Sequence, residues 1–342
     1  MMSTSGSVAV LGAGVIGLST AAAVLDLLPD VKVTVMADKF GADTTSYGSG
    51  GLFVPSLFSA GEDNKHRYRQ WMRESGSYFR ELLTGPEAGV AGAMALSGFL
   101  LARTEEDIEV EPPYRDDVIS FREMTKQELH RLGLSEYKHG YAITTYIINQ
   151  SKYLQWMQKN LEKRGVTFIQ KRFTDLSELC GQFGAVVNCT SLGSRELCGD
   201  RKLYALRGHM VRVRAPWIKH WVYVDHDTYI IPGEDLVALG GSKVEGDETL
   251  IPDPARGREI RDRCERLCPA IKCAEADHEW VGLRPCRKGG IRLEIQTLST
   301  GGRSMKVIHN YGHGTSGVAY SWGTALEAAR YVRDVITPGA RL

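Results

Sequence analysis

The feature that most constrains the fold is a glycine motif near the N-terminus. Residues 7–11 favour a β-strand and lead directly into Gly-Ala-Gly-Val-Ile-Gly at 12–17. Residues 18–28 then have apolar side chains at helical spacing up to Pro29, and the apolar run 31–36 predicts a second buried strand. Because such a strand–helix–strand crossover is right-handed, the glycine turn lies at the carboxyl end of the first strand of a parallel sheet.

This turn suits a dinucleotide. Glycines allow the backbone to approach a pyrophosphate closely, and a helix N-terminus offers unpaired N–H groups with partial positive charge. Asp38 follows the second strand about 20 residues further on, where a carboxylate can accept hydrogen bonds from a ribose hydroxyl. The alternatives are a turn that is merely tight and a carboxylate that merely faces solvent. With a strand before it and a helix after it, the motif favours dinucleotide binding.

A second glycine-rich turn bears on which dinucleotide is bound. Residues 306–310 predict a strand, 312–317 a tight turn, and 318–336 a long helix, so the chain returns to its nucleotide-binding sheet at the end. This places another helix N-terminus at the cofactor end, where its dipole can stabilise negative charge on a reduced flavin. A reduced nicotinamide is neutral and has no comparable need. The alternative is a left-handed turn that only joins strand to helix.

The rest of the chain shows two kinds of pattern. A helix predicted at 152–163 and strands at 166–170 and 185–189 extend the nucleotide-binding sheet, whereas 53–142 and 207–281 predict an antiparallel substrate lobe. With 342 residues, 43% of them apolar, the chain is long enough for two lobes. We predict an α/β fold: a Rossmann-like FAD-binding domain of 1–52, 143–206 and 282–342, with an interleaved, mainly antiparallel-sheet substrate domain of 53–142 and 207–281.

Charge and cysteine content narrow the class of partner. The 42 Lys and Arg nearly balance 41 Asp and Glu, which gives no electrostatic reason to expect nucleic acid or a membrane surface. No apolar run is long enough to cross a bilayer, and the stretch 8–18 lacks the basic segment of a signal peptide. Seven cysteines without a CxxC pair favour reduced thiols over disulfides or a zinc site. We expect a small-molecule substrate and no metal.

The C-terminal tripeptide Ala340-Arg341-Leu342 has the small-basic-leucine character of a peroxisomal address. Pro338 and Gly339 should end the last helix and leave this tail free for the import receptor. We predict a peroxisomal location, with a chance match and a cytoplasmic location as the alternative. The sequence leaves open whether the chain forms a homo-oligomer.

Arg284 is a candidate for substrate binding. It lies in Gly-Leu-Arg-Pro at 282–285, just after a predicted strand. A guanidinium group can hold a carboxylate through two parallel hydrogen bonds. The alternative is a solvated surface charge, the commoner state of an arginine.

Several segments together resemble the FAD-dependent D-amino-acid oxidases, and within that family the D-aspartate-oxidising branch. The matching stretches are 12–19, 37–40, 43–46, 186–189, 229–233, 282–285 and His309-Asn310-Tyr311-Gly312-His313-Gly314, which is a specific family signature. The resemblance runs nearly end to end and implies noncovalently bound FAD. The residues it assigns to FAD are Gly12, Ala13, Gly14, Val15, Ile16, Gly17, Asp38, Lys39, Thr44, Thr45, Ser46, Gly51, Leu52, Cys189, Thr190, Gly312, His313, Gly314, Thr315, Ser316, Gly317 and Val318.

The resemblance also implies how a D-amino acid is held. Arg284 and the hydroxyl of Tyr229 clamp its α-carboxylate, so that the Cα–H faces flavin N5 and leaves as hydride once the amine is neutral. No acid–base side chain is needed, and we interpret His309 and His313 as structural or cofactor-lining rather than catalytic bases. The imino acid then hydrolyses to a 2-oxo acid and ammonia, and oxygen is reduced to hydrogen peroxide.

The short segment 225–228 before Tyr229 resembles the acidic-substrate branch, since oxidases of neutral D-amino acids carry a longer lid with an extra tyrosine there. The stretch 192–195 resembles that branch as well. Lys243 stands at the position where the acidic-substrate branch carries an arginine, and it would contact the second carboxylate of the substrate. Thr315 stands at the position where that branch has a small hydroxyl residue. Its hydroxyl would orient the second carboxylate or, alternatively, cap a helix.

Three departures keep oxidation of neutral D-amino acids open as an alternative. Lys243 has no guanidinium fork, an arginine of the acidic branch is replaced near Tyr223, and His209 replaces a glutamine. Two alternatives come from other classes: a nicotinamide-dependent dehydrogenase, and a protein that binds flavin without turnover.

Overall fold

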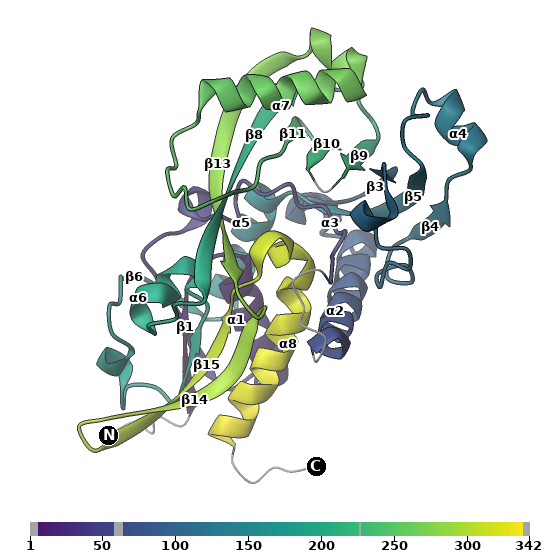
Figure 1. Cartoon of the computed structure of the whole chain (residues 1–342). Coiled ribbons are helices and arrows are strands. Elements are labelled where there is room, and N and C mark those ends of the chain that lie inside the picture. Colours follow the sequence, from purple (N-terminus) through teal and green to yellow (C-terminus); the bar gives the residue numbers. More distant parts are fainter. Residues whose placement is uncertain (1–5, 58–63, 226, 338–342) are drawn as a thin grey trace.

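Two β-sheets organise the chain in the computed structural model, which describes residues 6–57, 64–225 and 227–337. One sheet has six strands and the other nine. They lie toward opposite ends of an elongated molecule, and the long strands β8 (Leu203–Arg214) and β13 (Glu275–Arg287) run between these ends (Figure 1).

The six-stranded sheet is the predicted nucleotide-binding sheet. Its strand order is β14-β15-β7-β1-β2-β6, with bounds Arg292–Thr300, Arg303–Tyr311, Ala185–Asn188, Ser7–Leu11, Lys32–Ala37 and Thr167–Gln170. All neighbours are parallel except β14 and β15. The strands predicted at 7–11, 31–36, 166–170, 185–189 and 306–310 are confirmed, with shifts only at their ends.

The helices beside this sheet also follow the prediction. They are α1 (Val15–Leu27), α5 (Gln150–Lys163) and α8 (Gly317–Ile336), where helices were predicted at 18–28, 152–163 and 318–336. Helix α1 packs against both α5 and α8, and most of its residues are buried. Since β1, β7 and β15 all end on the side where α1 and α8 begin, both helix N-termini lie at one edge of the sheet (Figure 1).

The nine-stranded sheet is mainly antiparallel, as predicted. Its strand order is β12-β8-β11-β10-β9-β3-β5-β4, and β13 pairs with β8. The bounds not yet given are β12 (Val244–Glu245), β11 (Val237–Gly240), β10 (Thr228–Pro232), β9 (Trp221–Val224), β3 (Ala93–Ala102), β5 (His139–Ile148) and β4 (Ser120–Glu123). The pairing of β3 with β9 is parallel and the others are antiparallel. Helix α7 (Pro254–Leu267) covers one face through a cluster that includes Val211, Leu239 and Ile260.

The expectation of strands through 53–142 missed helix α2 (Lys65–Thr84) and the shorter α3 (Ala88–Ala91) and α4 (Lys126–Arg131). Helix α2 is polar overall and buries only one stripe, which includes Tyr68, Trp71 and Phe79. This stripe packs against α8, where Tyr68 meets Tyr320 edge to face. The stripe at helical spacing was the signal that could have revealed it.

The predicted domain boundaries fall inside strands. Strand β5 pairs with β3 from His139 to Ile148, so the boundary predicted at 142/143 falls within a strand of the nine-stranded sheet. Strands β8 and β13 pair continuously across 206/207 and 281/282. An extended strand advances about 3.3 Å per residue, so a dozen residues can cross from one lobe to the other without a break in pattern. The two-domain division itself stays a prediction.

All seven cysteines are free thiols in the structure. Among the described residues, no helix is both long enough and apolar enough to cross a membrane. The tripeptide at 340–342 lies outside the described residues.

Candidate functional site

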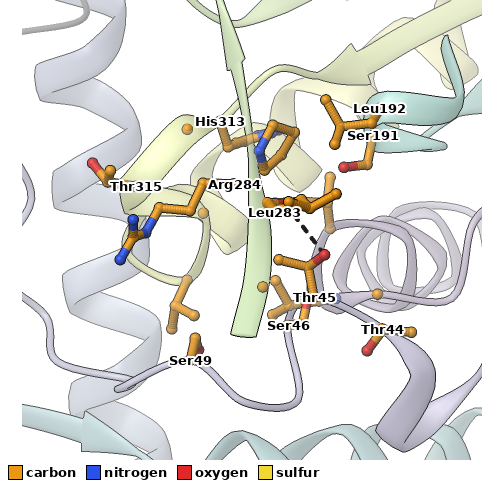
Figure 2. A pocket seen from close by; sticks show the side chains of 18 of the residues that line it. Thr44, Thr45, Ser46, Ser49, Ser191, Leu192, Leu283, Arg284, His313 and Thr315 are labelled. Atoms are coloured by element: carbon orange, nitrogen blue, oxygen red, sulfur yellow. Dashed lines mark hydrogen bonds between the residues drawn. The ribbon is translucent and has the colours of Figure 1, made fainter. Parts of the chain in front are cut away.

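One cavity of about 1250 Å³ brings together nearly all the residues proposed from sequence. It is lined by both glycine turns, by the end of β2, by the segment that follows η2 (Gly41–Asp43), and by β10 and β13. Every residue assigned to FAD or substrate lines it except Gly17. Residues more than 200 positions apart in sequence meet here: the Thr45 hydroxyl donates to the Leu283 carbonyl at 3.3 Å (Figure 2).

The first glycine turn is shaped by backbone contacts. Gly12 has φ of +107°, and a Cβ atom there would lie 2.5 Å from the Cys189 carbonyl oxygen. A Cβ at Gly17 would lie 1.9 Å from the Gly12 carbonyl oxygen. Gly17 therefore closes the helix onto the turn and does not itself face the cavity. The turn is tight, as one alternative proposed, and it also lines the cavity.

The start of helix α1 is open toward the cavity. Its N-cap, Gly14, has no side chain to cap the helix, and the Val15 N–H donates to the Ser46 hydroxyl at 3.0 Å. Asp38 and Lys39, just beyond β2, are exposed and line the same cavity. A helix N-terminus without an acidic first turn retains the partial positive charge that favours a phosphate.

The second glycine turn contributes a second helix N-terminus. A 3₁₀ turn at Gly314–Ser316 leads into α8, and the N-cap Ser316 makes no side-chain capping hydrogen bond. Thr315 lines the cavity, and the described structure holds no hydrogen bond by which it caps α8. The fit to a dinucleotide thus rests on two helix starts that line one cavity and whose N-cap residues make no side-chain capping hydrogen bond.

The two histidines near this turn already have partners. The His313 ring is buried, its Nε2 lies 3.1 Å from the Thr324 hydroxyl, and burial lowers its pKa to about 3. His309 does not line the cavity; its Nε2 lies 2.8 Å from Gln296 Oε1, and burial together with the charge of Arg292 lowers its pKa to about 4. Both rings are therefore neutral near pH 7.

Arg284 lies within β13, not after a strand as the sequence suggested. The strand was underestimated because Gly282 and Pro285 are poor strand formers, and here they pair with β8. Arg284 is half-buried, and its Nη1 donates to the Ser242 carbonyl at 2.8 Å. Figure 2 shows its side chain extending from β13 on the side where Thr315 lies.

Tyr229 faces the same cavity from β10. Burial raises the pKa of its hydroxyl, while the charges of Arg284 and Arg212 act in the opposite direction. The phenol and the guanidinium are thus close enough to influence each other, and the hydroxyl keeps its proton at neutral pH. The segment between β9 and β10 is short, spanning 225–227.

Lys243 lies just after β11 in the same wall. Desolvation lowers the pKa of its ammonium group, and the charge of Arg284 lowers it further, although Asp227 opposes this. Within the described parts of the chain, neither Lys243 nor Arg284 forms an ion pair. Asp227 also lines the cavity and pairs instead with Arg263 at 3.5 Å. One end of the cavity therefore carries two cations without a carboxylate bound to either.

Sequence reasoning missed several residues of the cavity wall. Trp280 lies over two glycines: a Cβ at Gly48 or at Gly282 would lie 2.0 Å from its ring. Glu109 accepts hydrogen bonds from the Ser56 hydroxyl and the Leu57 N–H, and burial raises its pKa. Neither residue was marked in the sequence, because Gly48 lies far from Trp280 along the chain and nothing near Glu109 singled it out.

Comparison with known proteins assigns the class. The chain belongs to the FAD dependent oxidoreductase family, whose model matches residues 7–331. FAD is therefore its cofactor, and the nicotinamide-dependent alternative is wrong. The family resemblance stated from the sequence is confirmed.

The relatives are oxidases. The chain is 40% identical to the D-aspartate oxidase of Homo sapiens over 330 residues, which cover 96% of this chain and 95% of the relative. It is 33% identical to D-aspartate oxidase 1 of Caenorhabditis elegans over 335 residues, 96% and 97% of the two chains. The structure of glycine oxidase from Bacillus cereus superposes with a TM-score of 0.77 at 18% identity, covering 98% of this chain and 96% of that one, and shares the fold.

Proposed function

We propose that this chain oxidatively deaminates D-amino acids and prefers D-aspartate. The observation that carries the proposal is the pair of cations at one end of the cavity, Arg284 and Lys243, beside the hydroxyl of Tyr229. A substrate with one carboxylate needs only one of these charges. A substrate with two carboxylates uses both, and a buried or half-buried cation gains most when it is paired. The D-aspartate oxidases of Homo sapiens and Caenorhabditis elegans among the relatives support the same substrate.

In this proposal Arg284 and Tyr229 hold the α-carboxylate. Arg284 uses Nη1 on the Ser242 carbonyl, which fixes the guanidinium and leaves its other N–H groups to donate to the substrate. The Tyr229 hydroxyl, still protonated at neutral pH, donates a further hydrogen bond. Lys243, with Thr315, contacts the side-chain carboxylate.

The same two cations help to deprotonate the substrate amine. A positive charge close to an ammonium group disfavours its charged form and lowers its pKa. Arg284 and Lys243 therefore favour the neutral amine, whose lone pair is needed when the Cα–H leaves. FAD, when bound, supplies the acceptor for the hydrogen and electron pair. The resulting imino acid takes up water to give a 2-oxo acid and ammonia, while oxygen receives the two electrons and two protons as hydrogen peroxide.

No side chain needs to act as the base. His313 is neutral but its ring nitrogen already faces Thr324, and His309 lies outside the cavity. Two unassigned carboxylates of the wall have partners of their own: Glu109 accepts hydrogen bonds from Ser56 and Leu57, and Asp227 pairs with Arg263. Positioning of the Cα–H is then the main contribution of these residues.

For FAD we propose that the pyrophosphate lies at the start of α1, a ribose at Asp38, and the flavin near the start of α8. The two helix starts support this arrangement, because their N-cap side chains occupy none of the N–H groups that can meet negative charge. Gly17 supports the turn from behind. We further propose a peroxisomal location through residues 340–342.

An oxidase of neutral D-amino acids is the second candidate. Leu100, Tyr114 and Tyr223 give the cavity an apolar wall, and the arginine expected of the acidic branch is replaced near Tyr223. Peroxide release from D-aspartate, D-asparagine and D-alanine decides between the two. D-asparagine has nearly the shape of D-aspartate without the second charge, so we expect D-aspartate to be the better substrate. An equal or higher kcat/KM for D-asparagine contradicts the acidic preference.

A further inference from the structure

Two glycines lie directly beneath the substrate-binding side chains. In the β8–β13 pair, Arg284 is opposite Leu206 and lies diagonal to Gly208, which pairs with Gly282. In the β10–β11 pair, Tyr229 is directly opposite Gly240. Residues that are opposite or two apart share a face of a sheet, so both glycines lie on the face that presents Arg284 and Tyr229 to the cavity.

The side chains rest on these glycines at contact distance. A Cβ atom at Gly208 would lie 2.5 Å from Arg284 Cζ and 2.6 Å from its Nη1. A Cβ at Gly240 would lie 1.9 Å from Tyr229 Cζ and 2.4 Å from its hydroxyl oxygen. All four distances are far below van der Waals contact, so a methyl group at either position must displace the functional group above it.

A left-handed backbone conformation is not what favours glycine at either position. Neither Gly208 nor Gly240 has a positive φ, in contrast to Gly12 or Gly312. The closest atoms to a Cβ at these two positions all belong to one side chain, that of Arg284 or that of Tyr229. These contacts therefore constrain the site and not the fold.

We infer that Gly208 and Gly240 are positioning residues of the substrate site: they let the guanidinium of Arg284 and the phenol of Tyr229 lie flat on the sheet, at the height where both reach one carboxylate. The inference deepens the proposed function and rests on it for the identity of that carboxylate. A methyl group at 208 lifts the guanidinium away from the Ser242 carbonyl that fixes it. The chain can fold around the displaced side chain, but the Arg284 guanidinium no longer reaches the substrate carboxylate.

Gly257 provides a matched control. It lies in helix α7, outside the cavity, and a Cβ there would lie 2.5 Å from Glu279 Oε1, again the end of a side chain. Gly257→Ala thus introduces the same kind of close contact outside the cavity, against a carboxylate that lies 2.7 Å from His209 Nε2. Comparing it with Gly208→Ala separates an effect on the site from a general effect of overpacking.

The test uses the FAD-loaded enzyme and the variants Gly208→Ala, Gly208→Val, Gly240→Ala and Gly257→Ala. Succinate, which is aspartate without its amine, is titrated against the flavin absorbance, and KM and kcat are measured with D-aspartate. We expect Gly208→Ala and Gly240→Ala to raise the succinate Kd and the KM for D-aspartate roughly 10- to 100-fold, because each variant loses one or two charge-assisted hydrogen bonds to the ligand. Gly208→Val should raise them further, and Gly257→Ala should match the wild type. FAD content and Tm should stay at wild-type values in both alanine variants.

A double-mutant cycle distinguishes positioning from a structural role. In an Arg284→Ala background, Gly208→Ala should have no further effect on the succinate Kd, because the group that it displaces is gone. Additive losses, a wild-type succinate Kd in Gly208→Ala, or a fall in Tm or FAD content in both alanine variants would each overturn the inference. If the wild type binds succinate but no D-amino acid reduces its flavin, the proposed function fails while the titration still tests the glycines.

Discussion

The two ends of the cavity use glycine for different reasons. At the cofactor end, Gly12 and Gly17 are required because backbone meets backbone: the nearest atoms to an added Cβ are carbonyl groups that cannot move aside. At the substrate end, Gly208 and Gly240 lie beneath side chains that can move. The first kind of glycine holds the fold together around the cofactor, and the second holds functional groups in place. Substitutions at the two ends should therefore fail in different ways.

Arg284→Ala should give the largest effect. Removing a half-buried cation from a charge pair costs about 2–5 kcal/mol, so kcat/KM for D-aspartate should fall at least about thirtyfold, and turnover should be nearly abolished. FAD should stay bound, because both glycine turns remain intact. Steady-state peroxide release and the flavin absorbance of the purified variant check the two parts. Turnover at the wild-type rate would refute the clamp.

Gly17→Ala tests the cofactor end. Its Cβ would lie 1.9 Å from the Gly12 carbonyl oxygen, so the turn must distort, at a cost of about 1–3 kcal/mol in unfolding free energy. We expect a lower Tm and loss of FAD on gel filtration. Gly89→Ala is the control, since no atom lies within 4 Å of an added Cβ there. A variant that keeps its FAD and its Tm would remove the distinction between the two ends.

Lys243→Met sharpens the description of the substrate end. Losing the second cation should lower kcat/KM for D-aspartate by about 1–2 kcal/mol, roughly 5- to 30-fold, and leave D-asparagine almost unchanged. Lys243→Arg restores the charge and adds the fork, so it should keep or increase the preference. The measured quantity is the ratio of kcat/KM for the two substrates. An equal loss for both would show that Lys243 does not contact the second carboxylate.

The buried histidines predict a smaller, pH-dependent effect. The pKa of His313 in the folded chain is lowered to about 3 and that of His309 to about 4. The unfolded chain takes up protons near pH 6.5, so stability is complete above that pH and falls as the pH drops toward the folded-state values. Between pH 6.5 and 5.5 each histidine should lower the free energy of unfolding by about 1 kcal/mol. Denaturant unfolding of the wild type and of His313→Gln at both pH values measures how the free energy of unfolding changes with pH. The same change in both proteins would contradict the lowered pKa of His313.

Much of the cofactor end could be predicted because its signals are local. The strand, the glycine motif and the helix of 7–28 follow one another in sequence, and 306–336 repeats the pattern. The bounds of β1, β2, α1 and α8 follow from those patterns to within a few residues. The contact of Gly17 with the Gly12 carbonyl lies within one turn and follows from the sequence pattern, whereas the contact of Gly12 with the Cys189 carbonyl joins two strands and does not.

The substrate end could be predicted only in part because its contacts are not local. Arg284 and Tyr229 were named through family resemblance, but Gly208, Gly240 and Trp280 gained meaning only when β8, β10, β11 and β13 were paired. Helix α2 was missed because its buried stripe is narrow within a polar sequence. The predicted domain boundaries near 142/143, 206/207 and 281/282 fall within β5, β8 and β13, which run through them without a change of pattern.

The central claim is that Arg284, Tyr229 and Lys243 hold a D-amino acid with its α-hydrogen toward the flavin. Mixing the purified, FAD-loaded chain anaerobically with D-aspartate tests it most directly, with L-aspartate as the control. We expect the yellow absorbance to bleach with the D-enantiomer alone and to return when oxygen is admitted. An absorbance that no D-amino acid changes would contradict the claim.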